Sequence, residues 1–170
     1  MASEIPKNRV VQLTGFINDE CAHSVIAHLL FHHMEDPESP VFLRIDSFGG
    51  SVTASLAILD TMRFVNCPVT TECRGIAYGC AAVIFAAGSP GMRRATRDAA
   101  FGFTRTVLGE ETQDMRATAA HLAQLHERLI LELSRTCRQK PSRIAEDMDV
   151  ERQFTATEAI QYGLADEEIS

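Results

Sequence analysis

Residues 69–88 read VTTECRGIAYGCAAVIFAAG, and this stretch decides the fold. It begins with a β-branched run over residues 69–73, which is typical of a buried strand. Gly75 and Gly79 follow, and residues 81–87 are then almost wholly apolar, so a helix there must be buried on all sides. The stretch therefore predicts a strand, a glycine turn and a buried helix.

The preceding segment repeats this pattern. Residues 41–45 predict a short strand, Gly49 and Gly50 predict a turn, and the apolar spacing over residues 52–65 predicts a helix. Two such units in succession indicate parallel strands joined by right-handed connections. The sequence thus predicts an α/β fold.

The other elements are predicted by hydrophobic spacing and by capping residues. The longest is an amphipathic helix over residues 113–135. The rest are a strand at 9–13 ending in a Thr14-Gly15 turn, a helix at 19–34 capped by Asn18 or Asp19, a strand at 99–103, and helices at 141–147 and 155–162.

Composition limits the function classes. A chain of 170 residues with 45% hydrophobic and 23% charged residues fits one globular domain spanning 1–170. The net charge of -7 opposes binding to nucleic acid or to anionic membranes. No apolar run is long enough to cross a bilayer and the start is polar, so we expect a cytoplasmic protein.

Cysteine, histidine and arginine clusters suggest no cofactor. The five cysteines are odd in number and form no Cys-x-x-Cys pair, which suits reduced thiols. Four histidines fall within the helix expected at 19–34, and we expect this helix to be solvated or to lie at an interface rather than to bind a metal. A basic turn at Arg93, Arg94 and Arg97 is expected to pair with acidic groups at the surface.

Five motifs occur in order along the chain: DSFGGSV (46–52), LAILDTM (56–62), CRGIA (73–77), AAG (86–88) and EAIQYGLAD (158–166). Together they resemble the proteolytic subunit of the ATP-dependent Clp protease. The resemblance implies a Clp/crotonase-like α/β fold of stacked ββα units with a long protruding handle helix, which would be the helix expected at 113–135.

The resemblance also locates the catalytic triad, and all three positions have changed. In that family the nucleophilic serine opens the buried helix, and the matching segment GIAYGC places Gly79 there. The histidine position in GFTRT (102–106) is Thr104, and the aspartate position is Glu151. A chain with no nucleophile and no base is expected to be proteolytically inactive and to act as a structural or regulatory ring subunit.

The oxyanion-hole donors are backbone groups and are less affected by these changes. By resemblance they are the N–H groups of Gly49 and Cys80, and a peptide carbonyl could still dock there. Phe48 stands where the family usually has proline.

Two alternatives stay open. Cys80, one residue past the serine position, could serve as a substitute nucleophile in an active ATP-dependent endopeptidase. The fold also occurs in crotonase-like proteins that bind acyl-CoA, with paired N–H groups holding a thioester enolate.

Partners follow from the same resemblance. It implies self-association into a heptamer-like ring, or co-assembly with active Clp-type subunits. Arg44 replaces an aromatic residue on a strand that commonly serves Clp ATPase docking, so docking of an ATPase is not expected.

Overall fold

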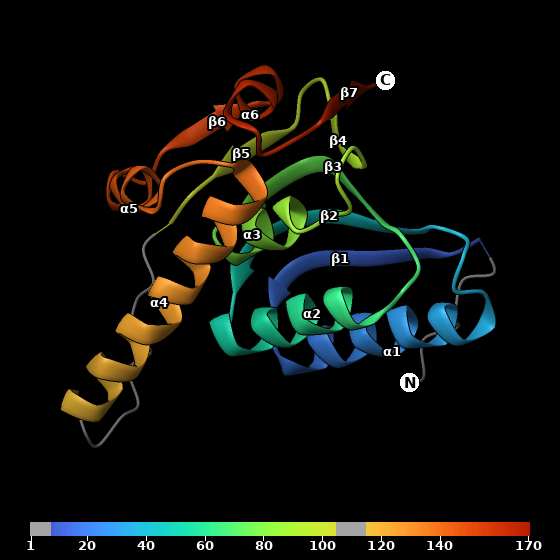
Figure 1. Ribbon diagram of the computed structural model, residues 1–170, viewed down its shortest axis with the longest axis horizontal. Coiled ribbons are helices and arrows are strands. Elements are labelled where there is room, and N and C mark those ends of the chain that lie inside the picture. The colour runs from blue at the N-terminus through green and yellow to red at the C-terminus, as the bar shows by residue number, and fades with distance from the viewer. Residues whose placement is uncertain (1–7, 105–114) are drawn as a thin grey trace.

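This computed structural model describes residues 8–104 and 115–170. Strands and helices alternate through most of the chain, as an α/β fold requires (Figure 1). The elements in order are β1 (Val10–Ile17), α1 (Asp19–Glu35), β2 (Val41–Gly50), α2 (Val52–Phe64), β3 (Val69–Tyr78), α3 (Cys80–Ala86), β4 (Arg93–Thr96), β5 (Ala100–Gly102), α4 (Met115–Cys137), α5 (Pro141–Asp149), β6 (Gln153–Thr155), α6 (Ala156–Tyr162) and β7 (Glu167–Ile169).

The strands form one sheet in the order β1-β2-β3-β4-β7, and every neighbouring pair along this path is parallel. β5 pairs in parallel with the distal half of β3 and antiparallel with β6. The parallel arrangement predicted from the repeated strand–glycine–helix units is therefore confirmed.

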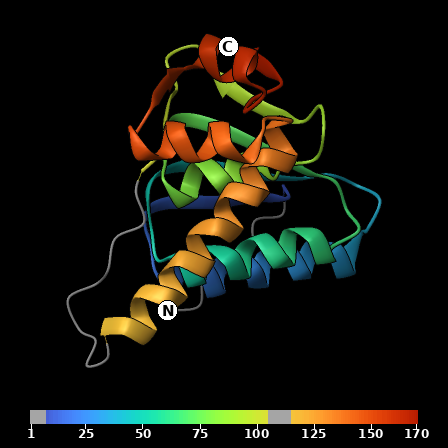
Figure 2. The ribbon, with the colours of Figure 1, turned by 60° about the vertical axis from the view of Figure 1, so that its left-hand side comes forward.

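Helix α4 extends away from the sheet, and its first turns project beyond the rest of the described chain (Figures 1 and 2). It corresponds to the long amphipathic helix predicted from residues 113–135, although residues 113 and 114 lie outside the described part. Within the described residues no helix combines the length and the apolar character needed to span a membrane.

Helix α3 forms the centre of the core. All seven of its residues are buried, as its continuous apolar sequence predicts. Its Phe85 ring lies 4.8 Å from that of Phe101 on β5, and α3 also packs against β2 and β3. The helix is therefore enclosed by the sheet and by α4, which holds its N-terminal residue in a fixed place.

The predicted caps are present. Asn18, rather than Asp19, caps α1, because its side chain accepts a hydrogen bond from the backbone N–H of Cys21 at 2.9 Å. Thr155 and Glu158 form a reciprocal capping box at the start of α6, and Gly163 ends that helix at φ 88°.

Three strands are longer than predicted. β1 continues through Gly15, β2 through Gly50 and β3 through Gly75, so these glycines lie within strands and not in turns. Irregular strand pairing explains the difference, because the register shifts between Thr14 and Phe16 and again after Ile45. The extra length carries the strand ends directly to the starts of the helices.

The prediction of a basic turn at residues 93–97 was wrong. Residues 93–96 form strand β4, and Arg93 is buried, not at the surface. Strand β4 lacks the apolar alternation of a typical strand, because a charged residue, Arg93, occupies a buried position. Its side chain points inward to hydrogen-bond acceptors, whereas Arg94 points outward. Strands β6 and β7 were also not predicted, and each has only three residues.

His32 on α1 is expected to make the free energy of unfolding depend on pH. Its side chain is fully buried and neither ring nitrogen makes a hydrogen bond, although Nδ1 lies 3.5 Å from Oε2 of Glu35. Burial lowers the pKa of His32, with Glu35 opposing the shift. Because the folded state favours the neutral ring, the free energy of unfolding should fall as the pH drops below about 6.5, the ordinary histidine pKa.

Urea denaturation at pH 7.5 and pH 5.5 checks this expectation. The variant His32→Leu should lose part of the difference between the two pH values, whereas His23→Gln, at an exposed position of the same helix, should keep it. An unchanged pH difference in His32→Leu would show that other groups carry the effect.

Candidate functional site

The turn between β3 and α3 has the geometry of a nucleophile elbow. Gly79 adopts φ 53° and ψ -124°, its N–H donates to the carbonyl of Gly102 at 2.8 Å, and its carbonyl accepts from the N–H of Ala82 at 3.1 Å. Side-chain-bearing residues rarely adopt this conformation, and hydrolases use such strained strand-to-helix turns to present a nucleophile. Here the turn is kept but carries no side chain.

Thr104 lies directly against this turn. A Cβ atom built on Gly79 would stand 2.5 Å from the Thr104 hydroxyl oxygen, so the two positions are neighbours in space. The resemblance to the Clp family assigns them as the serine and histidine positions, and the structure brings them together. A threonine hydroxyl is not basic enough to take up a proton near neutral pH, so it cannot replace an imidazole as general base.

Glu151 lies just before the segment that pairs with the end of β5. Gly102 is opposite Gln153 in the antiparallel pair, and the next N–H, that of Phe103, donates to the carbonyl of Arg152 at 2.9 Å. Glu151 itself precedes this paired segment and lies in a turn, where its N–H donates to the carbonyl of Met148 at 3.1 Å. Glu151 is exposed with φ 50°, and no imidazole stands at position 104 for its carboxylate to orient.

The Gly49 N–H, one of the two expected oxyanion donors, is already engaged. It donates to the hydroxyl of Ser47 at 3.0 Å, and that hydroxyl donates to the carbonyl of Gly15 at 2.5 Å. Gly49 also packs closely on the elbow, because a Cβ there would lie 2.8 Å from the carbonyl oxygen of Tyr78. An incoming oxyanion would therefore have to displace Ser47 from the Gly49 N–H.

Two aromatic side chains lie beside the elbow. Phe48 is 74% exposed, and its ring centroid lies 6.0 Å from that of Tyr78. The Tyr78 ring lies against Gly102, where a Cβ would come within 2.5 Å of its Cδ1 atom. The sequence comparison singled out Phe48 but missed Tyr78 and Ser47, although both lie inside the motifs that it used. Their contacts, not their residue types, link them to the site.

Cys80, the alternative nucleophile, is buried at the first position of α3. Burial raises the pKa of its thiol, and a hydrogen bond with Ser55 offsets this only in part. A thiol with a raised pKa carries little thiolate near neutral pH, and thiolate is the reactive form.

We expect iodoacetamide near neutral pH to modify the partly exposed Cys21 before Cys80 in the folded protein. Peptide mass spectrometry after timed labelling measures the two rates, and labelling in concentrated guanidinium chloride gives the reference for the unfolded chain. Rapid labelling of Cys80 in the folded protein would instead support the thiol alternative.

The described residues 8–104 and 115–170 contain no group of three or more His, Cys, Asp or Glu side chains arranged to hold a metal ion. Of the histidine-position segment GFTRT, residues 105 and 106 lie outside the described residues.

A parallel sheet, a buried helix opened by an elbow and a long projecting helix define the class of Clp/crotonase-like α/β proteins. The model of the Clp protease family matches residues 1–170. The chain therefore belongs to the Clp protease family.

Proposed function

We propose that this chain is a subunit of a Clp-type assembly that does not itself cleave peptides. The proximity of Gly79 and Thr104 carries the proposal, because Gly79 has no side chain to act as a nucleophile and Thr104 has no basic group, at the two positions that the resemblance assigns to serine and histidine. The proximity of Gly79 and Thr104 supports the assignment of these two positions, which lie far apart in the sequence.

The size of the catalytic loss follows from known triads. Removing the nucleophile or the base typically costs about 10⁶ in rate, and oxyanion donors with binding contacts leave only about 10³–10⁴ over water. The Gly49 N–H is bound to Ser47, which weakens even that remainder. We therefore expect no useful rate of peptide cleavage at the elbow.

The role that fits such a subunit is structural or regulatory. We propose that it forms a ring with itself or with active Clp-type subunits in the cytoplasm, shaping the chamber without adding a cutting site. Arg44 pairs with Glu72 at 3.0 Å on the strand assigned to ATPase docking, so docking of a Clp ATPase is not expected. The net charge of -7 likewise gives no reason to expect nucleic acid or membrane as a partner.

Hydrolysis of short fluorogenic peptides by the purified protein tests the proposal. We expect no turnover above the buffer rate, with an active Clp peptidase as positive control. If the chain co-assembles with active subunits, a mixture of the two chains should sediment as one species that contains both. Turnover that follows the protein through purification and is abolished by alkylation would place catalysis on a thiol and overturn the proposal.

A further inference from the structure

A row of alternating charges crosses the sheet. Arg44 on β2, Glu72 on β3, Arg94 on β4 and Glu167 on β7 are partners in register on successive parallel strands, so their side chains lie on the same face. Arg44 Nε lies 3.0 Å from Glu72 Oε2, and Arg94 Nε lies 2.6 Å from Glu167 Oε1. We refer to these four residues as the charge row.

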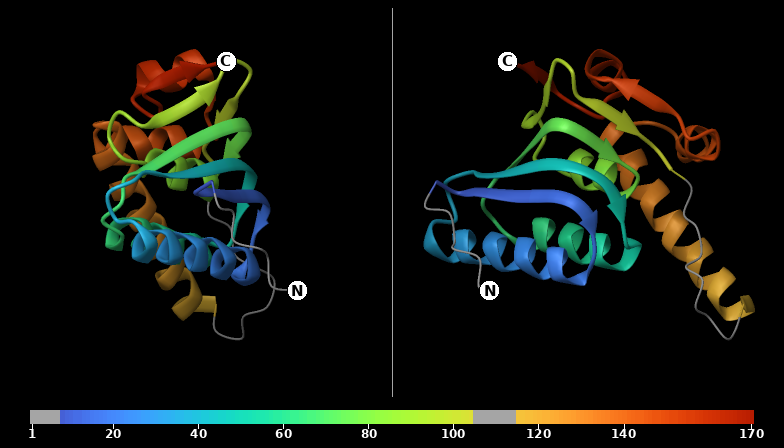
Figure 3. Two further views of the ribbon diagram at one scale, coloured as in Figure 1. Left: turned by 90° about the vertical axis from the view of Figure 1, so that its right-hand side faces the viewer. Right: turned by 180° about the vertical axis from the view of Figure 1, so that it is seen from behind.

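The charge row lies on the outward face of the sheet. Val41, Leu43 and Ile45 point inward and are fully buried, whereas Phe42 and Arg44, which alternate with them, are partly exposed. Helices α1 and α2 pack on one side of β1 and β2, and the other side of these strands faces outward (Figure 3).

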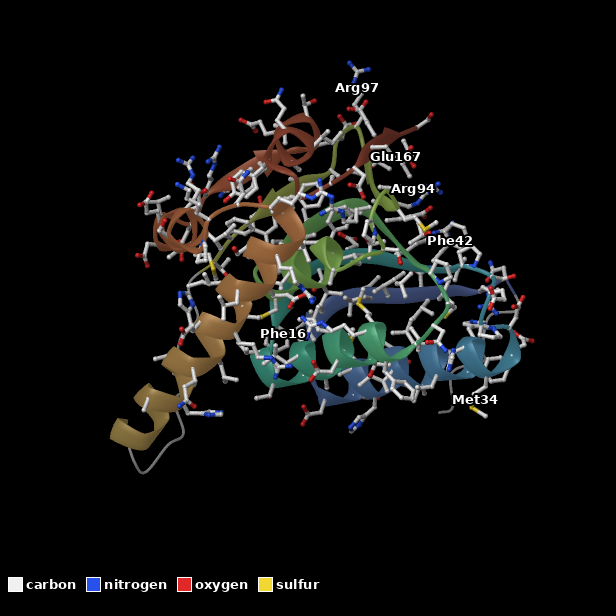
Figure 4. The ribbon with its side chains drawn as sticks, viewed as in Figure 1. Phe16, Met34, Phe42, Arg94, Arg97 and Glu167 are labelled. Atoms are coloured by element: carbon white, nitrogen blue, oxygen red, sulfur yellow. The ribbon has the colours of Figure 1, made fainter. Side chains whose placement is uncertain are left out.

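Three members of the charge row are accessible to a partner. The exposed fraction is 38% for the Arg44 side chain, 35% for Arg94 and 48% for Glu167, while Glu72 is covered by its neighbours. Arg94 and Glu167 lie along the same side of the molecule as Phe42 (Figure 4). Long charged side chains of this kind can reach across to a second surface.

The order of charges is complementary to itself when reversed. Along the sheet the charge row reads plus, minus, plus, minus, so a copy turned by a two-fold axis reads minus, plus, minus, plus. With the axis parallel to the strands and midway between β3 and β4, Arg44 faces Glu167 of the partner subunit and Glu72 faces Arg94 of the partner subunit. Glu72 is covered by its neighbours, so the contact rests on the accessible ends of the row, where Arg44 of each copy meets Glu167 of the partner subunit.

We propose that the charge row is a two-fold contact between two copies of this chain. The adjacent row does not oppose it, because Arg74, two residues beyond Glu72 on the same face, would lie opposite Thr96 of the partner subunit. The contact goes beyond the proposed ring, since ring contacts are head-to-tail whereas this one joins the same patch on both copies. Partly exposed ion pairs are weak and screened by salt, so the association should be reversible and favoured at low ionic strength.

Two charge reversals test the geometry. Arg44→Glu and Glu167→Arg should each weaken pairing, because like charges then meet twice in each symmetric pair. Mixing the two variants should restore pairing, since Glu at 44 then meets Arg at 167 and the native residues meet on the other side. Arg97→Glu, an exposed reversal outside the charge row, is the matched control and should pair like the unaltered chain.

Sedimentation velocity gives the readout. At about 1 M salt, where the screening length is near 3 Å, the unaltered chain should sediment as its smallest assembly. At about 0.05 M salt it should sediment as a species of twice that mass. Each reversal alone should weaken the association by roughly tenfold or more. The mixture should recover it.

The proposal is overturned if the mass of the unaltered chain does not double at low salt. It is also overturned if both charge-reversal variants still double, or if mixing them does not restore pairing. Because Arg44→Glu sets a second carboxylate beside Glu72, far-UV circular dichroism must first show that it folds. If it does not, Arg44→Gln replaces it and should weaken pairing, and unaltered pairing in that variant would also count against the contact. Peptide hydrolysis is measured separately, so the failure of one proposal does not imply failure of the other.

Discussion

Gly79→Ser is expected to hydrolyse no peptide and to be less stable than the unaltered protein. The substitution restores the hydroxyl of the family's nucleophile, but Thr104 supplies no base to take its proton. It also places a side chain on a residue at φ 53° and ψ -124°, a conformation that costs about 1–3 kcal/mol. The new Cβ would stand 2.5 Å from the Thr104 hydroxyl oxygen, so that side chain or the elbow must move.

Urea denaturation and peptide hydrolysis measure the two effects. Gly79→Ala is the matched control, because it introduces the same backbone strain and the same Cβ without a hydroxyl, and it should be destabilised to a similar extent. Adding Thr104→Ala to either variant removes the opposing oxygen and should recover part of the lost free energy of unfolding, which a double-mutant cycle quantifies. Rapid cleavage by Gly79→Ser alone would contradict the assignment of Gly79 and Thr104.

The sequence predicted element types better than element ends. Helix α3 was predicted because every residue over 81–87 is small or apolar, and the structure buries it on all sides. Gly15, Gly50 and Gly75 were expected in turns, yet they extend strands, since a glycine shows where the backbone is unusual and not whether a strand stops there. β4 was missed because a buried arginine breaks the apolar pattern on which strand prediction depends.

For the candidate site, too, the sequence predicted positions but not contacts. Counting within motifs assigned Gly79, Thr104 and Glu151, and the structure brings the first two of these positions together. The bond from the Gly49 N–H to Ser47 could not be foreseen, because it depends on how β2 shifts its register against β1 and β3. The motifs thus led to the candidate site, whereas only the tertiary contacts show that one of its N–H donors is already hydrogen-bonded.

Arg93→Ala is expected to be among the most destabilising single substitutions in this chain. The guanidinium is buried and donates to both carboxylate oxygens of Asp166, to the carbonyl of Gly163 at 2.7 Å and to the carbonyl of Thr136 at 3.2 Å. It therefore joins β4 to the end of α4 and to the segment between α6 and β7. Removing one partner of a buried ion pair typically costs about 3–5 kcal/mol, because the other charge is left without compensation.

The neighbouring Arg94 provides the control. It is partly exposed and pairs with Glu167 at the surface, so Arg94→Ala should cost at most about 1 kcal/mol. Both variants are compared by urea denaturation in about 1 M salt, where contacts through the charge row are screened. Equal losses for Arg93→Ala and Arg94→Ala would contradict a structural role for the buried guanidinium.

The same pair predicts how the protein responds to acid. Burial alone would raise the pKa of Asp166, but the hydrogen bonds and charge of Arg93 outweigh it and hold that pKa below its usual range. This stabilisation is present above about pH 3.9, the ordinary aspartate pKa, and is lost as the pH falls toward the lower folded value. Arg93→Ala removes the partner, so its free energy of unfolding should decline less steeply below about pH 4 than that of the unaltered protein. A decline of the same slope in both proteins would assign the acid sensitivity to other carboxylates.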